Sequence, residues 1–185
     1  YFRAILPVHP RYQVLYALRE AAHLWAIGEK RPAINHLERA FERQPSSGAL
    51  ASQLIEYLFS FQNIEKAQII LQKFNDQVSK SEPSMPYLTM ARLLLDKNRI
   101  KEANEILGRI PISQTVAEMV EAAILMRKAK DMKGAHHLFA GAYSLNPDDP
   151  KIVHEFAQTK MRLASRLWRK EDIETKKRLN REAAG

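Results

Sequence analysis

The residues of this sequence that could take part in chemistry do not form a catalytic or metal-binding pattern. His136 and His137 are of a metal-ligand type, but adjacent residues of a helix point about 100° apart, and no carboxylate stands at helical spacing to complete a site. The sequence has no Cys, no glycine-rich phosphate loop, no nucleophile elbow and no paired carboxylates in an apolar context. We therefore expect no catalytic residues, no metal, no cofactor and no enzyme activity.

Basic residues gather in the last part of the sequence. From Lys160 onward nine Lys and Arg face four Asp and Glu, a surplus of five within a net charge of +8. The residues that would suit contact with a polyanion, such as RNA or an acidic polysaccharide, are Arg169, Lys170, Lys176, Lys177 and Arg178. Acidic residues interleaved with them also fit a solvated helix surface, which is the commoner explanation of such a run.

An internal repeat predicts the elements that would position these side chains. A small residue is followed four positions later by a large apolar residue, and three positions after that by another apolar one. The first residues of the four occurrences are 34, 36 and 32 residues apart: Ala33, Ala67, Ala103 and Ala135. Spacings of three and four place residues on one face of a helix. The pattern therefore predicts antiparallel helix pairs in which the alanines permit a close approach.

A period of about 34 residues resembles that of the tetratricopeptide repeat (TPR) family. The family's small residue twelve positions before each alanine, and its proline twelve after, are matched at Ala21, Pro45, Ala91, Ala123 and Pro147. The second unit departs from this pattern at Ile55 and Ser79, and only Gly28 matches the family's turn glycine. The resemblance implies an all-α fold, a right-handed α-solenoid of about four helix-turn-helix repeats with a long C-terminal capping helix.

The predicted domain boundaries follow from this period. Residues 1–10 are interpreted as the end of a preceding repeat or a linker, residues 11–149 as four repeats (about 11–45, 48–79, 84–111 and 115–147), and residues 150–185 as a C-terminal capping and basic helix. Helices are predicted at about 11–27, 31–44, 48–61, 64–78, 85–97, 100–109, 115–129, 132–145 and from 150 onward. Thr115 with Glu118 forms a capping-box pattern, and Asp149 ahead of Pro150 predicts a helix start.

The resemblance also implies where a partner would bind. In TPR proteins the first helix of each pair lines a concave groove, and its second, fifth, ninth and twelfth positions point into that groove. The candidate groove residues at these positions are Leu18, Trp25, Glu56, Phe59, Leu88, Arg92, Ile124 and Arg127. A mainly apolar groove suits an amphipathic helix or an extended peptide, with Arg92 and Arg127 as candidate carboxylate partners. The lysines and asparagines of the chaperone-binding members are absent, which argues against a co-chaperone.

We expect, on this basis, a protein–protein interaction scaffold that binds a partner peptide or helix in the groove, within a larger assembly. Two alternatives stay open: polyanion binding through the basic C-terminal helix, and the repeat region of a bacterial envelope export or polymer-secretion protein, as some TPR proteins are. No apolar run is long enough to span a membrane, so a soluble cytoplasmic or periplasmic segment is expected. Because the sequence begins with Tyr1, we interpret it as a fragment of a larger protein.

Overall fold

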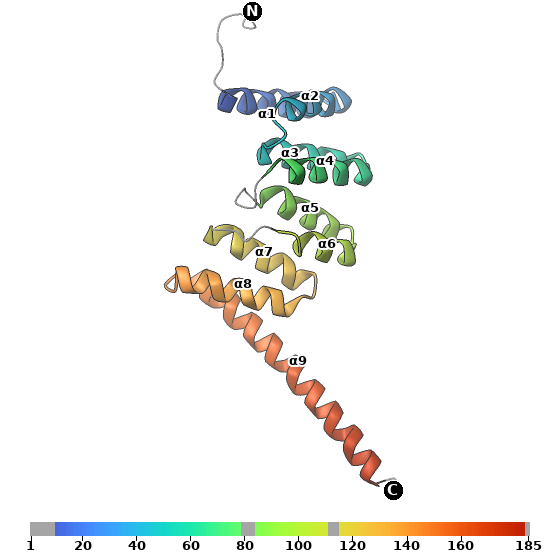
Figure 1. Cartoon of the computed structure of the whole chain (residues 1–185), viewed down its shortest axis with the longest axis vertical. Coiled ribbons are helices and arrows are strands. Elements are labelled where there is room, and N and C mark those ends of the chain that lie inside the picture. The colour runs from blue at the N-terminus through green and yellow to red at the C-terminus, as the bar shows by residue number, and fades with distance from the viewer. Residues whose placement is uncertain (1–9, 79–83, 111–114, 184–185) are drawn as a thin grey trace, which may run out of the picture. The chain divides into compact units, whose positions relative to one another are not determined.

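Short turns join the two helices of each pair in this protein, whose computed structural model describes residues 10–78, 84–110 and 115–183 (Figure 1). The helices are α1 (Pro10–Ala26), α2 (Lys30–Arg43), α3 (Gly48–Ser60), α4 (Ile64–Gln77), α5 (Met85–Asp96), α6 (Ile100–Leu107), α7 (Val116–Lys128), α8 (Met132–Leu145) and α9 (Pro150–Ala183). The predicted helices agree with these bounds to within two residues. The predicted preceding repeat or linker falls almost entirely outside the described residues.

The chain divides into two compact units, Tyr1–Ser113 and Gln114–Gly185. In the first unit α1 packs against α2, α3 against α4, and α5 against α6. In the second unit α7 packs against α8, and α8 against the long helix α9. These pairs confirm the helix-turn-helix repeats predicted from the period.

The alanines that define the repeat are buried at the contact between the two helices of each pair. Ala33, Ala67, Ala103 and Ala135 have no exposed surface. The large apolar residues four positions later are at most 5% exposed: Leu37, Leu71, Leu107 and Phe139. A buried large side chain of this kind typically stabilises a fold by about 1.5–3 kcal/mol, so each of these four contributes substantially to the stability of its pair.

Two predicted helix starts have side-chain caps. The Thr115 hydroxyl accepts a hydrogen bond from the Glu118 backbone N–H at 3.4 Å and donates one to the Glu118 carboxylate at 2.8 Å. Asp149 Oδ1 accepts from the backbone N–H groups of Lys151 at 2.8 Å and Ile152 at 3.4 Å. Such caps satisfy donors that a helix start leaves without partners, and each typically contributes about 1 kcal/mol.

The turn inside each pair holds one residue in the left-handed region, at the same place in every repeat. These residues are Gly28, Gln62, Asn98 and Lys130, with φ of 88°, 57°, 58° and 67°. Each lies five positions before a repeat alanine, so the backbone of the turn is kept where the family's glycine has been replaced. Non-glycine residues adopt this conformation at a cost of about 1–2 kcal/mol, and Asn does so most readily.

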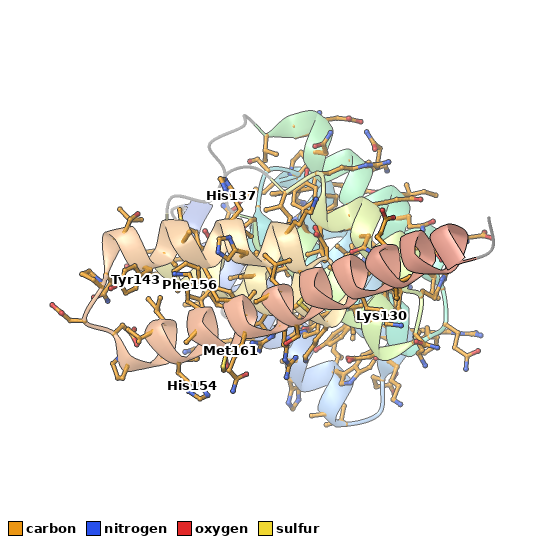
Figure 2. All side chains as sticks on the ribbon, turned by 90° about the horizontal axis from the view of Figure 1, so that it is seen from below. Lys130, His137, Tyr143, His154, Phe156 and Met161 are labelled. Atoms are coloured by element: carbon orange, nitrogen blue, oxygen red, sulfur yellow. The ribbon has the colours of Figure 1, made fainter. Side chains whose placement is uncertain are left out.

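Helix α9 begins against α8 and continues well beyond it. Tyr143 and Phe156 lie between the two helices, with their ring centroids 5.7 Å apart, whereas His154 and Met161 point away from α8 (Figure 2). Among the side chains of α9 that the structure describes, Thr159 is the last one that is buried. Among the helices of the described part, none combines the length and the apolar character needed to cross a membrane.

Candidate functional site

The first helices of the three pairs in the first unit lie side by side. Helix α3 contacts both α1 and α5, and the predicted groove residues from Leu18 to Arg92 all belong to these three helices. We call the layer formed by α1, α3 and α5 the inner layer.

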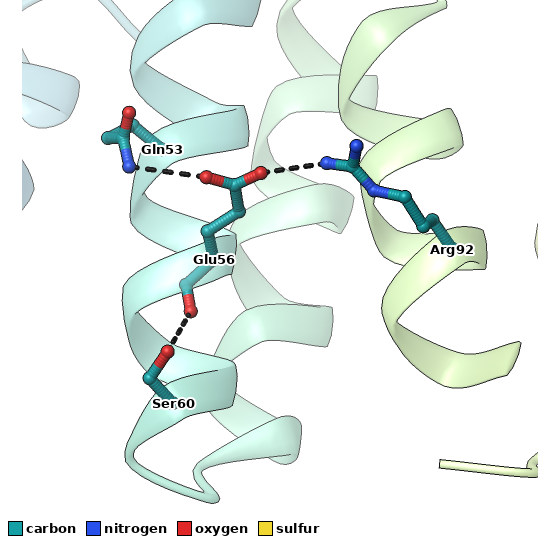
Figure 3. A network of polar contacts seen from close by, with 4 residues as sticks. All are labelled: Gln53, Glu56, Ser60 and Arg92. Atoms are coloured by element: carbon teal, nitrogen blue, oxygen red, sulfur yellow. Dashed lines mark hydrogen bonds and ion pairs between the residues drawn. The ribbon is translucent and has the colours of Figure 1, made fainter. Parts of the chain in front are cut away.

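A polar network occupies the middle of the inner layer. Arg92 of α5 donates a hydrogen bond to the Glu56 carboxylate of α3 at 2.8 Å, and Gln53 donates to the other oxygen of that carboxylate at 3.3 Å (Figure 3). The Ser60 hydroxyl donates to the Glu56 backbone carbonyl at 3.0 Å. The side chains of Arg92 and Glu56 are 46% and 38% exposed. Exposed pairs of this kind contribute only about 0–1 kcal/mol, so a ligand carboxylate could displace Glu56 from Arg92 at little cost.

An aromatic cluster lies between α1 and α3. The rings of Trp25 and Tyr57 are stacked, with centroids 3.8 Å apart and planes 15° apart, and Phe61 meets Trp25 edge-on at 6.1 Å. The Lys30 ammonium lies 5.5 Å from the Trp25 ring centroid, close enough for a cation–π interaction. Burial, and secondly the charge of Glu56, raise the pKa of Tyr57 above its usual value. Trp25 is half-buried and Phe61 is 40% exposed, so the cluster offers aromatic surface to a ligand.

Two of the predicted groove residues are buried instead of facing a ligand. Phe59 is 4% exposed and Leu88 is 2% exposed, and Leu18 is half-buried. The physical reason is that neighbouring helices cover much of both surfaces: α3, which carries Phe59, contacts α1, α2, α4 and α5, and α5, which carries Leu88, contacts α3, α4 and α6. Phe59 and Leu88 therefore contribute packing to the inner layer, and in this structure they have almost no surface with which to touch a partner.

The two predicted groove residues of α7 belong to the second unit, where they hold its own helices together. Arg127 is 13% exposed, pairs with Glu155 of α9 at 2.5 Å, and has its guanidinium carbon 5.9 Å from the Phe139 ring centroid. Ile124 is half-buried against the core cluster that contains Phe139. Arg127 thus already has a carboxylate partner, which the sequence did not indicate.

The basic residues proposed as a polyanion contact belong to helix α9, of which the structure describes the backbone but not the side chains at these positions: Arg169, Lys170, Lys176, Lys177 and Arg178. This hypothesis stays a prediction. Nearer the start of α9, the Lys160 ammonium lies 4.1 Å from the Phe156 ring centroid, and the His136 ring lies 5.2 Å from the same ring. The described part of the chain contains no group of three or more His, Cys, Asp or Glu residues that could hold a metal ion.

Sequence reasoning missed Tyr57 and Phe61, which form most of the aromatic cluster. Each is two positions in sequence from Phe59, the residue that the family's register selected for the groove. A signal was available, because Tyr57 of α3 and Phe61, the residue that ends this helix, are four positions apart, a spacing that places side chains on the same side of a helix. Tyr57 is itself only 7% exposed and supports Trp25 by stacking, so the exposed aromatic surface comes from Trp25 and Phe61.

Comparison with known proteins places the fold. No protein-family model and no curated protein matches the chain. The Pseudomonas aeruginosa pilF structure is 16% identical, with 84% of this chain and 71% of that chain covered and a TM-score of 0.55. MamA of Desulfovibrio magneticus RS-1 is 12% identical, with 92% and 96% covered and a TM-score of 0.51. YrrB, described as a TPR protein with an unusual peptide-binding site, is 14% identical, with 81% and 77% covered and a TM-score of 0.50.

These similarities establish the fold. The chain has the helical-repeat fold of TPR proteins, as its 34-residue period predicted. At 12–16% identity the similarity establishes this fold and assigns no partner.

Proposed function

We propose that the chain is a protein–protein interaction scaffold that binds a peptide or helix of a partner protein on the exposed face of the inner layer, within a larger assembly. The observation that supports this proposal is the packing of α1, α3 and α5 side by side in one compact unit. A rigid layer of helices lowers the ordering cost of binding, because the surface exists before the partner arrives. The similar fold of YrrB, with its peptide-binding site, supports the same interpretation.

The chemistry of the inner layer favours a ligand with an apolar or aromatic anchor and a nearby carboxylate. Trp25 and Phe61 supply aromatic surface next to the Lys30 ammonium. Arg92 can donate hydrogen bonds to a ligand carboxylate in place of its present exposed partner, Glu56. Anchor residues of this type carry most of the binding energy in protein interfaces.

The test uses peptides selected from a random library displayed on phage, with the intact chain as the target. Dissociation constants for the selected peptides would then be measured by fluorescence anisotropy on the chain and on its variants. We expect Phe61→Ala to weaken binding by about tenfold, which corresponds to about 1.4 kcal/mol, and Arg92→Gln to weaken it by about threefold, as expected for one exposed ion pair. Both side chains are substantially exposed, so neither change should disturb the core.

Matched controls come from second helices and lie outside the inner layer. Leu145→Ala removes an apolar residue that is 59% exposed on α8, and Arg39→Gln removes an exposed charge on α2. These two variants should bind the selected peptides like the unchanged chain. If Leu145→Ala weakened binding while Phe61→Ala did not, the inner layer would not be the binding surface and the proposal would be wrong.

A further inference from the structure

A hollow lies between the second helices α4 and α6 of the first unit. Its volume is about 830 Å³, within the range of ligand-binding sites. The base of the hollow includes three apolar or aromatic residues that are at most 8% exposed, namely Leu71, Tyr87 and Ile106. Helix α6 has only 8 residues, whereas α4 has 14, so α6 offers less helix to cover the facing side of α4.

One wall of the hollow is a row of amide side chains on α4. Gln68, Gln72 and Asn75 line the hollow, and their spacings of four and three residues correspond to about 6 Å and about 4.5 Å along the helix axis. Since such spacings place residues on the same face of a helix, the three amides form a ladder. A ladder of amides can hydrogen-bond to the backbone of an extended chain, whose own groups repeat about every 6.7 Å on one side.

Part of each amide remains available to a ligand. Gln68 donates to Glu102 at 3.4 Å and Gln72 donates to Asp76 at 2.7 Å, both through the side-chain nitrogen. Asn75 accepts from the Tyr87 hydroxyl at 2.5 Å through its side-chain oxygen. Within the described ranges, the side-chain oxygens of the two glutamines and the side-chain nitrogen of the asparagine are thus left for a ligand.

The charges around the hollow are predominantly acidic. Glu65, Glu102 and Glu105 line it together with Arg109. Asp76 and Arg109 also lie close enough to act on the Tyr87 hydroxyl, whose pKa is raised chiefly by burial. Arg99, which does not line the hollow, is engaged with Glu102 by two hydrogen bonds, at 2.5 and 2.6 Å. Among the lining residues, three carboxylates against one guanidinium leave a negative balance of two on a chain whose net charge is +8.

We propose that this hollow binds a short extended peptide segment that carries Lys or Arg at alternate positions. From Glu65 to Asn75 the α4 wall is about 15 Å long, which matches about five residues of extended chain. The backbone of the segment would pair with the amide ladder, and alternate side chains would reach Glu65 and Glu105. This site is distinct from the inner layer, so it adds a second binding surface to the proposed scaffold.

The experiment measures fluorescence anisotropy of three labelled hexapeptides on the intact chain: (Ala-Lys)3, (Ala-Gln)3 and (Ala-Glu)3. We expect the lysine peptide to bind, and the neutral and acidic peptides to bind at least about tenfold more weakly, because the acidic wall supplies much of the affinity. The overall positive charge of the chain repels a basic peptide, so general attraction cannot produce this order. Equal binding of the neutral or acidic peptide would overturn the proposal.

Variants then locate the site. Glu105→Gln and Gln72→Ala should each weaken binding of the lysine peptide by about threefold to fivefold, as expected for one surface ion pair or one hydrogen bond. Glu29→Gln is the matched control, since it removes one exposed carboxylate from the same unit outside the hollow. If Glu105→Gln and Glu29→Gln had the same effect, the proposal would fail.

One further variant separates this proposal from the proposed function. Glu56→Gln changes the inner layer and should leave binding of the lysine peptide unchanged. A loss confined to Glu56→Gln would place the basic peptide on the inner layer, which would refute the hollow as a site while supporting the inner layer as one. Side-chain amide signals of Gln68, Gln72 and Asn75 provide an independent readout, because a nitroxide on the bound peptide should broaden them.

Discussion

Two glycines of helix α8 provide a sharp test of the packing in the second unit. Glycine inside a helix is less favourable than alanine by about 0.8–1.0 kcal/mol, so propensity alone predicts the same gain from Gly134→Ala and Gly141→Ala. Their surroundings differ. A Cβ at Gly141 would meet only Met119 Sδ, at an ordinary 3.7 Å. A Cβ at Gly134 would lie 2.8 Å from Met126 Sδ and 3.0 Å from the carboxyl carbon of Asp131, and closer still to Asp131 Oδ2.

Asp131 is the N-cap of α8, which makes the clash at Gly134 costly. Its carboxylate accepts a hydrogen bond from the Gly134 backbone N–H at 3.0 Å, and loss of such a cap costs about 1 kcal/mol. We therefore expect Gly141→Ala to stabilise the unit by about 1 kcal/mol, whereas the gain at Gly134 is offset by loss of the cap. Displacing Met126 adds to the cost, so Gly134→Ala should be neutral or destabilising by up to about 1.5 kcal/mol.

Urea unfolding followed by circular dichroism at constant m-value measures these differences. In the background of Asp131→Ala, which removes the cap and the clashing carboxylate but leaves the contact with Met126, Gly134→Ala should be more favourable than in the presence of Asp131 by about 1 kcal/mol, the value of the cap. The reasoning is refuted if Gly134→Ala and Gly141→Ala stabilise the chain equally when Asp131 is present. It is also refuted if the effect of Gly134→Ala does not depend on Asp131.

Three further predictions concern other contacts. Breaking the largely buried pair of Arg127 and Glu155 with Glu155→Gln should destabilise the second unit by about 2 kcal/mol, between the values for exposed and buried pairs. A double-mutant cycle with Arg127→Met in urea unfolding should show a coupling of about 1 kcal/mol, and no coupling would contradict the role of the pair. Since burial raises the pKa of Tyr57 in the folded state, the contribution of the neutral phenol to the free energy of unfolding should be fully present below the ordinary tyrosine pKa of about 10 and should be lost as the pH rises above it. Tyr57→Phe should lessen that loss in unfolding curves recorded from about pH 9 to pH 11. Gln62→Gly should raise the thermal unfolding midpoint, because glycine avoids the cost of about 1 kcal/mol that a non-glycine residue incurs in the left-handed region. An unchanged or lower midpoint would show that the turn is not strained.

The helices could be predicted from the sequence because their determinants are local. A buried alanine such as Ala33, a large apolar residue four positions later and a cap such as Thr115 all act within one or two turns. The glycine of the turn was a weaker guide. The left-handed position recurs in every described pair, but a glycine occupies it only at Gly28, so the backbone preserves a feature that the residue type no longer shows.

The candidate site was less predictable because exposure depends on neighbouring helices. Phe59 occupies a groove position in the family's register but is buried, and Arg127 has a partner on α9. One contact could have been found. Glu56 and Arg92 occupy the same ninth position in consecutive repeats, 36 residues apart, which equals the local period. Opposite charges at one register of adjacent repeats therefore predict an ion pair across the layer.

This cross-repeat pairing has a consequence for what each surface can recognise. On the inner layer, Glu56 and Arg92 largely cancel each other, so the aromatic surface of Trp25 and Phe61 should dominate binding there. Around the hollow between α4 and α6 the charges do not cancel. Because salt screens exposed charges over about 10 Å at 0.1 M, binding to the hollow should weaken steeply as salt is added. Binding to the inner layer, which combines one exposed ion pair with aromatic contacts, should weaken less. The two surfaces would then respond independently to two ligands of different chemistry, as a scaffold that joins two partners requires.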